Sequence, residues 1–319
     1  GLVGSEMCIR DRDITTYVKL AGEGDYAQAL RVILEKNALP FITGTLCAHN
    51  CMYKCTRNFY EEPVNIRNTK LIAAQNGYDT VIDEIKAGTA DGKKVAVVGA
   101  GPAGIASAYF LARAGASVTV FEKEEKAGGV IRYVIPGFRI SDEAIDNDVK
   151  IVAAMGVEMV NGKEITDIEA LKKDYDYVVL AVGASEQGVL KLEAGDTMNA
   201  LDFLARFKAT EGKVELGKNV VVIGGGNTAM DTARAAKRNA GVEKVSLVYR
   251  RTRRYMPADE EELVMAVEDG VEFAELLAPV KLENGVLYCK KMVLGDMDAS
   301  GRRGVVATDE TCLLYTSDA

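Results

Sequence analysis

Residues 94–129 read KVAVVGAGPAGIASAYFLARAGASVTVFEKEEKAGG, and this stretch decides the fold. The apolar run at 95–98 is typical of a buried strand, and a G-x-G-x-x-G pattern follows it before a helix expected from residue 105. Gly99 permits the tight turn, Gly101 lets the backbone approach a pyrophosphate, and Gly104 lets helix and strand pack closely. The phosphates would lie at the helix N-terminus, whose N–H groups favour negative charge. The stretch therefore predicts a dinucleotide-binding unit, and a glycine-rich turn without a ligand is the less favoured alternative.

The next expected strand, at 117–121, ends at Glu122. A carboxylate at the end of this strand accepts hydrogen bonds from a ribose and repels a 2′-phosphate. The first site is therefore predicted to hold FAD or NAD rather than NADP.

A second copy of the pattern begins at residue 218 with KNVVVIGGGNTAMD. Gly224, Gly226 and Ala229 form G-x-G-x-x-A between an expected strand and an expected helix. The following strand, at 244–249, runs into Arg250 and Arg251, with two more arginines at 253 and 254. Guanidinium groups bind phosphate in a bidentate manner, so the change from Glu122 to Arg250 predicts NADPH in the second site. A solvated basic surface is the alternative.

A cysteine-containing segment precedes both units. LCAHNCMYKCTR carries Cys47, Cys51 and Cys55, with the only histidine, His49, between the first two. On a helix these positions share one face, so a stripe of buried thiols is one interpretation. Zinc bound by the cysteines and His49 is a second, and an iron–sulfur cluster, which normally needs four ligands, is a third. From the residues alone a metal is favoured over buried thiols, with iron–sulfur the favoured metal.

Composition excludes several classes of function. The 319 residues carry 39 Lys and Arg against 47 Asp and Glu, a net charge of −8, so we expect no nucleic-acid partner. The uncharged stretch 95–112 resembles a membrane span, but its glycines and its change from strand to helix predict a folded unit and no membrane contact. Six cysteines without a secretory signal predict reduced thiols or metal ligands and a cytoplasmic location. The oligomeric state cannot be inferred.

Both ends of the chain differ in character from the rest. Residues 1–12 (GLVGSEMCIRDR) and 312–319 (CLLYTSDA) resemble translated sequencing-adapter read-through, with ordinary disordered termini as the alternative. We therefore expect a fragment in which Cys8 and Cys312 carry no function. The expected organisation is an adapter-like tail at 1–12, a helical cysteine-containing domain at 13–90, an incomplete FAD domain at 91–190, an NADPH domain at 191–308 and a second tail at 309–319.

An acidic and a basic dinucleotide site together indicate a flavoprotein that takes hydride from NADPH onto FAD. No acid–base residue is needed for that step, and no catalytic side chain is assigned. A disulfide reductase is disfavoured because the sequence contains no C-x-x-C pair. A non-catalytic nucleotide-binding scaffold with a zinc-binding cysteine region remains the alternative from another class.

Six motifs, taken in order, resemble the glutamate synthase small subunit and the N-terminal half of dihydropyrimidine dehydrogenase. They are LCAHNCMYKCTRNFYEEPVNI, GAGPAGIASAYFLARAG, FEKEEKAGG, VIPGFRI, GGGNTAMD and VYRRTRRYMP. Within that group, the selenate reductase-type subunits are the most similar. The resemblance implies an α/β fold with two Rossmann-like domains, the NADPH domain inserted in the FAD domain, after a small helical iron–sulfur-type domain. It also implies electron flow from NADPH through FAD and 4Fe-4S clusters to a partner subunit or downstream domain.

The resemblance also assigns residues. It implies FAD contacts at Gly99, Gly101, Pro102, Ala103, Gly104, Glu122, Lys123, Gly129, Arg139 and Gly183. It implies NADPH contacts at Gly224, Gly226, Asn227, Thr228, Arg250, Arg251 and Arg254, and cluster ligands at Cys47, Cys51 and Cys55. Three departures are expected to leave the clusters and the FAD site incomplete: the upstream cysteine row is absent, Lys70 stands at a ligand position, and the strand that returns to the FAD domain is missing.

Overall fold

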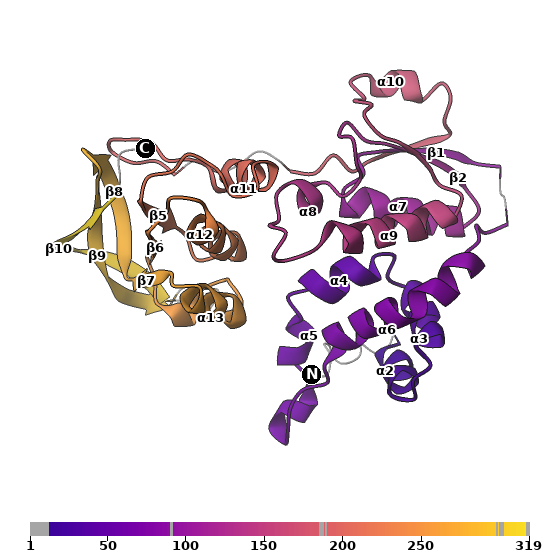
Figure 1. Cartoon of the computed structure of the whole chain (residues 1–319), viewed down its shortest axis with the longest axis horizontal. Coiled ribbons are helices and arrows are strands. Elements are labelled where there is room, and N and C mark those ends of the chain that lie inside the picture. Colours follow the sequence, from indigo (N-terminus) through magenta and orange to yellow (C-terminus); the bar gives the residue numbers. More distant parts are fainter. Residues whose placement is uncertain are drawn as a thin grey trace. The chain divides into compact units, whose positions relative to one another are not determined.

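The computed structural model describes residues 13–89, 92–184, 188, 190–297, 299 and 303–316. The expected tail at 1–12 lies outside them. The chain divides into two compact units, the first made of residues 1–133 and 137–185 and the second of residues 134–136 and 186–319 (Figure 1). Each unit contains one parallel sheet, as the two glycine patterns predicted.

The first unit is built on a four-stranded parallel sheet. Its strands are β1 (Lys94–Val98), β2 (Ser117–Phe121), β3 (Glu158–Val160) and β4 (Tyr177–Leu180), in the order β3-β2-β1-β4. Helix α7 (Pro102–Arg113) follows β1, and helices α8 (Val130–Tyr133), α9 (Asp142–Ala154) and α10 (Ile168–Leu171) occupy the later connections. The glycine turn thus lies at the carboxyl edge of the sheet, where open α/β sheets bind ligands.

Helices also form the N-terminal part of the first unit. They are α2 (Ile14–Gly22), α3 (Tyr26–Leu34), α4 (Pro40–Leu46), α5 (Asn50–Tyr53) and α6 (Ile66–Val81), with short 3₁₀ turns η1 (Thr56–Phe59) and η2 (Ile82–Glu84). Apolar residues at three- and four-residue spacings over 13–36, interrupted by GEGD at 22–25, predict two short helices, which are confirmed as α2 and α3. Apolar side chains from α2, α3 and α6, including Tyr17, Ile33 and Ala73, form a common core.

The boundary expected at residue 90 does not separate two compact units, because the helical part packs on the dinucleotide unit. Tyr109 and Arg113 of α7 both donate hydrogen bonds to the carbonyl of Leu34, over 3.1 Å and 2.9 Å. Such long-range bonds cannot be read from local sequence patterns.

A buried carboxylate makes a second connection between these parts. Asp148 of α9 is fully buried and accepts hydrogen bonds from the backbone N–H groups of Phe41 (3.0 Å) and Ile42 (2.8 Å). These N–H groups belong to the first turn of α4, where no helical partner exists for them. Burial raises the pKa of Asp148 to about 8, although the two hydrogen bonds act in the opposite direction.

The second unit contains a three-stranded parallel sheet and a three-stranded antiparallel sheet. The parallel sheet consists of β5 (Asn219–Ile223), β6 (Lys244–Tyr249) and β7 (Glu272–Glu275). Helix α11 (Ala200–Ala209) precedes β5, helix α12 (Asn227–Arg238) connects β5 to β6, and the 3₁₀ turn η3 (Arg253–Tyr255) and helix α13 (Glu260–Glu268) lie between β6 and β7. The antiparallel sheet consists of β8 (Leu277–Glu283), β9 (Val286–Met297) and β10 (Arg303–Tyr315).

The Asn-Gly pair at 284–285, within an alternating segment, predicts a hairpin turn between two strands. This hairpin is confirmed, because both residues adopt positive φ angles between β8 and β9. The boundary expected between residues 308 and 309 instead falls inside β10, which pairs with β9 as far as Tyr315. The resemblance of the C-terminal residues to adapter read-through therefore did not predict how far this strand extends. No helix within the described residues is long and apolar enough to cross a bilayer.

We predict that Asp148→Asn removes a pH-dependent part of the stability. A carboxyl pKa raised from 3.8 to about 8 means that the folded state keeps a proton that the unfolded state has lost between these pH values. Asp148 therefore contributes stability below about pH 4 that is lost as the pH rises towards 8, at up to ~1.4 kcal/mol per pH unit. Urea unfolding followed by circular dichroism at pH 5 to 9 measures this slope.

The amide variant should show a smaller decline over this range than the parent protein. It should also be about 1–3 kcal/mol less stable at pH 5, because an NH₂ group would face one backbone N–H. Asp83→Asn, at an exposed position, is the matched control. Equal slopes in the parent and Asp148→Asn would contradict the assignment.

Candidate functional site

The first glycine turn is held through the peptide groups on either side of Ala100. The N–H of Ala100 donates to Oε2 of Glu122 over 2.7 Å, and its carbonyl accepts from the N–H of Gly128 over 2.8 Å. Oε1 of Glu122 accepts from the N–H of Glu124 over 3.0 Å, and the side chain is buried. Glu122 thus faces the turn and fixes its backbone.

The three motif glycines differ in their surroundings. A Cβ on Gly104 would overlap the carbonyl oxygen of Gly99, so helix α7 can approach β1 only because this side chain is missing. A Cβ on Gly101 would meet nothing closer than the Cα of Gly129, at 4.0 Å. Gly101 is the N-cap of α7, and the space beside it is available to a phosphate. This part of the chain therefore fits a bound dinucleotide.

Some of the remaining residues predicted for the first site adjoin this turn. Pro102 and Ala103 form the first turn of α7, and Gly129 approaches Gly101. Lys123 is exposed and lies 3.9 Å from Glu124, while Arg139 is half-buried. Gly183 is exposed just beyond β4 with a φ of 79°.

The second glycine turn is held by different groups. A Cβ on Gly225 would overlap the ring of Tyr249, and the carbonyl of Gly225 accepts from the N–H of Ala258 over 3.0 Å. Gly226 is the N-cap of α12, and a Cβ there would meet nothing within 4 Å. Asn227 accepts from the N–H of Asp259 over 3.0 Å, and Thr228 is exposed in the first turn. This turn also leaves room for a dinucleotide at a helix N-terminus.

Strand pairing changes one sequence-based correspondence. Gly99 donates to the carbonyl of Phe121, and Gly224 donates in the same way to Val248. The residue after Val248 is Tyr249, so Tyr249 and not Arg250 occupies the position of Glu122. Aligning the first residue after each strand places the correspondence one residue too late, because β6 ends one residue further along the paired register than β2 does. The second site therefore has an uncharged phenol where the first has a carboxylate.

The arginines begin one residue after Tyr249, and they differ in the interactions that they make. Arg250 is exposed, and Arg251 donates through Nε to the carbonyl of Arg303 over 3.1 Å. Arg253 forms an ion pair with Glu260 at 2.7 Å. Arg254 is exposed, lies over the ring of Tyr255 and lines a cavity of about 630 Å³.

The cysteine segment is not one continuous helix, so the interpretation as a single helix face is wrong. Cys47 follows α4 with extended backbone, Cys51 lies in the short helix α5, and Cys55 is extended again before η1. His49 breaks the helix because it adopts a left-handed conformation with φ of 38°. Among the described residues, His, Cys, Asp and Glu side chains form no group of three or more placed to hold a metal ion.

The Nδ1 atom of His49 already has a partner and is not available to zinc. His49 is buried, and its Nδ1 lies 2.7 Å from Nη1 of Arg67, which also donates to the carbonyl of Cys47 over 3.2 Å. Lys70, expected at a ligand position, is buried on α6. In the part of the chain that the structure describes, this segment does not make a complete cluster site.

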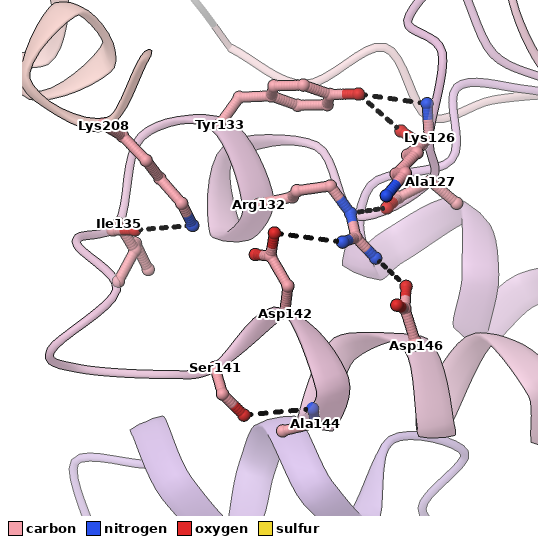
Figure 2. Close-up of polar contacts among 10 residues, drawn as sticks. All are labelled: Lys126, Ala127, Arg132, Tyr133, Ile135, Ser141, Asp142, Ala144, Asp146 and Lys208. Atoms are coloured by element: carbon pink, nitrogen blue, oxygen red, sulfur yellow. Dashed lines mark hydrogen bonds and ion pairs between the residues drawn. The ribbon is translucent and has the colours of Figure 1, made fainter. Parts of the chain in front are cut away.

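Sequence reasoning missed the side chains that support the first turn. Arg132 is buried and donates through Nε to the carbonyl of Ala127 over 2.6 Å (Figure 2). The hydroxyl of Tyr133 lies within hydrogen-bond distance of both the N–H and the carbonyl of Lys126. Both residues lie in the segment VIRYVIP at 130–136, but only the fold shows that they return to the turn before them.

Comparison with known proteins places these sites in a family context. Residues 93–281 match the pyridine nucleotide-disulphide oxidoreductase family, and residues 3–80 match the dihydropyrimidine dehydrogenase domain II, 4Fe-4S cluster family. The chain is 47% identical over 317 residues to the oxidoreductase YgfK of Escherichia coli strain K12, covering 96% of this chain and 30% of that protein. It is 35% identical to the glutamate synthase [NADPH] small chain of the same strain, covering 91% of this chain and 66% of that one.

A third relative is the NADPH-Fe(3+) oxidoreductase subunit beta of Geobacter sulfurreducens, 36% identical over 93% of this chain and 47% of its own length. The chain thus spans about a third to two thirds of these relatives. Among solved structures, a mutant of FprA from Mycobacterium tuberculosis matches with a TM-score of 0.58 at 18% identity, covering 70% of this chain and 69% of that one. The match to 2-naphthoyl-CoA reductase has a TM-score of 0.52 at 21% identity, over 76% and 35%. These two matches support the fold.

A single methyl group is predicted to have very different effects on stability at Gly104 and at Gly101. Gly104→Ala should lower the free energy of unfolding by about 1–3 kcal/mol, because the new Cβ would overlap the backbone of Gly99. Gly101→Ala should change it by less than about 0.5 kcal/mol, because its φ of −72° suits alanine and the space is open. Urea unfolding of both variants tests the contrast, and similar losses at the two positions would contradict it.

Proposed function

Because the chain belongs to the pyridine nucleotide-disulphide oxidoreductase family, we propose that it takes electrons from NADPH onto FAD and passes them to a partner subunit or downstream domain. The observation that carries this proposal is the contrast between the two glycine turns. The first is closed by the buried carboxylate of Glu122, and the second is followed by exposed Arg250 and Arg254. One fold thus offers sites of opposite charge for two different dinucleotides.

In the proposed first site, the backbone beside Gly101 and the N-terminus of α7 would hold the pyrophosphate of FAD. Glu122 already accepts two backbone N–H groups, and a carboxylate has capacity for about four hydrogen bonds, so acceptor capacity remains for ribose hydroxyls. Pro102, Ala103, Lys123, Gly129, Arg139 and Gly183 are proposed as further contacts. Bound FAD would supply the chemistry, which is acceptance of hydride and release of electrons.

In the proposed second site, the N-terminus of α12 beside Gly226 would receive the pyrophosphate of NADPH, with Asn227 and Thr228 in the same turn. Selectivity for the 2′-phosphate would come from two features. Tyr249 carries no charge where a carboxylate would repel that phosphate, and the next residue is an exposed arginine. Arg251 is proposed as a further contact. Its Nε donates to the carbonyl of Arg303, so its Nη groups would be the donors to the phosphate.

No electron step is assigned to the cysteine segment. The family matched by residues 3–80 implies a 4Fe-4S cluster, and the resemblance names Cys47, Cys51 and Cys55 as ligands. The described residues do not form a four-ligand site, so these cysteines remain proposed ligands of an incomplete set. The partner is proposed only as an electron acceptor, because relatives are named as subunits or chains.

A disulfide substrate is not proposed despite the family name. The sequence has no C-x-x-C pair, and Cys289 is buried in the second unit. The pKa of the Cys289 thiol is raised to about 11, mainly by burial and to a smaller extent by the neighbouring Cys312. Little reactive thiolate would therefore be present near neutral pH.

The test of the proposed function is anaerobic reduction of protein reconstituted with FAD. NADPH should bleach the flavin with an apparent second-order rate constant at least tenfold above that of NADH. The double variant Arg250→Gln, Arg254→Gln should lower the NADPH value by about tenfold to hundredfold, because charge-assisted bonds to the 2′-phosphate are lost. The NADH value should change little. Arg57→Gln, at an exposed position in the first unit, is the control. Failure of the parent chain to bind FAD would overturn the proposal.

Gly101→Ala should separate cofactor binding from folding. Its methyl group would enter the space proposed for the pyrophosphate, so the dissociation constant for FAD should rise at least tenfold while the urea midpoint stays near that of the parent. Gly137→Ala, in exposed open space, should alter neither quantity. Unchanged FAD affinity in Gly101→Ala would place the cofactor elsewhere.

A further inference from the structure

We propose that Arg132 is a positioning residue for the FAD site, acting through the turn formed by residues 127–129. This inference rests on the proposed function. Arg132 is 4% exposed, and its guanidinium group lies between that turn and the start of helix α9 (Figure 2). No sequence motif singled it out, and the assignment comes from three contacts.

The first contact reaches the turn itself. Nε of Arg132 donates to the carbonyl of Ala127 over 2.6 Å. A Cβ on Gly128 would come within 2.8 Å of the Cβ of Arg132, so the side chain lies directly against the turn. Arg132 therefore determines where this carbonyl, and the peptide that follows it, can lie.

The other two contacts reach α9. Nη2 donates to Oδ1 of Asp146, and Nη1 lies 3.7 Å from Oδ2 of Asp142, an ion pair too long for a hydrogen bond. Asp142 and Asp146 are four residues apart and share one face of the helix. The guanidinium fork thus ties the turn to a helix that is itself packed in the first unit.

The turn formed by residues 127–129 determines the space beside Gly101. Gly128 donates to the carbonyl of Ala100 over 2.8 Å, and a Cβ on Gly129 would come within 2.8 Å of the Cα of Gly101. A shift of this turn would either close the space beside Gly101 or open it. Arg132 therefore acts on the proposed pyrophosphate position through two backbone segments and without touching it.

The cost of this arrangement supports a positioning role. Nη1 of Arg132 is the one buried side-chain nitrogen or oxygen among the described residues without a hydrogen-bond partner. An unsatisfied buried donor destabilises a protein. A lysine could pair with Asp146 without burying an unpaired donor such as Nη1. Its single ammonium group could not, however, bind both Asp146 and the Ala127 carbonyl in the fixed geometry of a guanidinium group. The guanidinium group of Arg132 is therefore present despite an unsatisfied donor, which is consistent with a role in orienting the turn.

The experiment compares Arg132→Met and Arg132→Lys with the parent chain. FAD is titrated into each apoprotein to obtain a dissociation constant, and thermal unfolding is measured on the same samples. Both variants should bind FAD at least tenfold more weakly. Arg132→Lys should recover most of the thermal stability, because its charge still pairs with the carboxylates, but it should not recover FAD affinity.

Arg234→Met supplies the matched control. Arg234 is also buried and pairs with two carboxylates, Asp269 at 2.7 Å and Glu262 at 3.8 Å, but it lies in the second unit. This variant should lose stability while keeping the FAD dissociation constant within twofold of the parent.

Chemical rescue distinguishes a positioning role from general loss of structure. Ethylguanidinium at millimolar concentration should restore FAD affinity to Arg132→Ala, whereas ethylammonium should not. FAD affinity within twofold of the parent in folded Arg132→Met would overturn the inference, and so would full recovery of affinity in Arg132→Lys. Failure of the parent itself to bind FAD would instead overturn the proposed function, so the two failures are distinguishable.

Discussion

The first unit depends on the two hydrogen bonds that hold the peptide groups around Ala100. Its N–H is bound by the carboxylate at the end of β2, and its carbonyl is bound by the turn that follows. The pairing of Val98 with Phe121 brings Glu122 to this peptide, so the register of two parallel strands fixes the geometry of the glycine turn. A buried carboxylate is stable here because charge-assisted hydrogen bonds to backbone N–H groups replace those it had with water.

The second unit meets the same requirement without a carboxylate. Tyr249 occupies the corresponding register position, its ring covers Gly225, and its hydroxyl donates to the carbonyl of Tyr255 over 2.9 Å. Van der Waals contact and a neutral hydrogen bond therefore hold this turn and the arginine-containing loop after it. Because no fixed negative charge is needed, a basic surface can follow β6 directly. The different charges of the two sites thus go with different ways of holding a glycine turn.

Much of this fold could be predicted from the sequence, because its determinants are local. Apolar runs followed by spaced glycines identify β1 with α7 and β5 with α12, and the Asn284–Gly285 pair identifies a hairpin. Interactions between distant residues could not be predicted. The correspondence of Tyr249 with Glu122 depends on strand pairing, and the cysteine spacing of four suggests a helix that a left-handed His49 interrupts.

Helix α9 links the dinucleotide turn to the helical segment, because its carboxylates lie on different faces. At about 100° per residue, Asp142 and Asp146 are about 40° apart, whereas Asp148 lies about 200° further round. The first two face Arg132 and the turn beside Gly101, and the third caps α4, which ends immediately before Cys47. A displacement of α9 would therefore be felt at both places. This arrangement explains physically why the helical segment and the first sheet form one compact unit, since without α4 the buried carboxyl group of Asp148 would lose its hydrogen-bond partners.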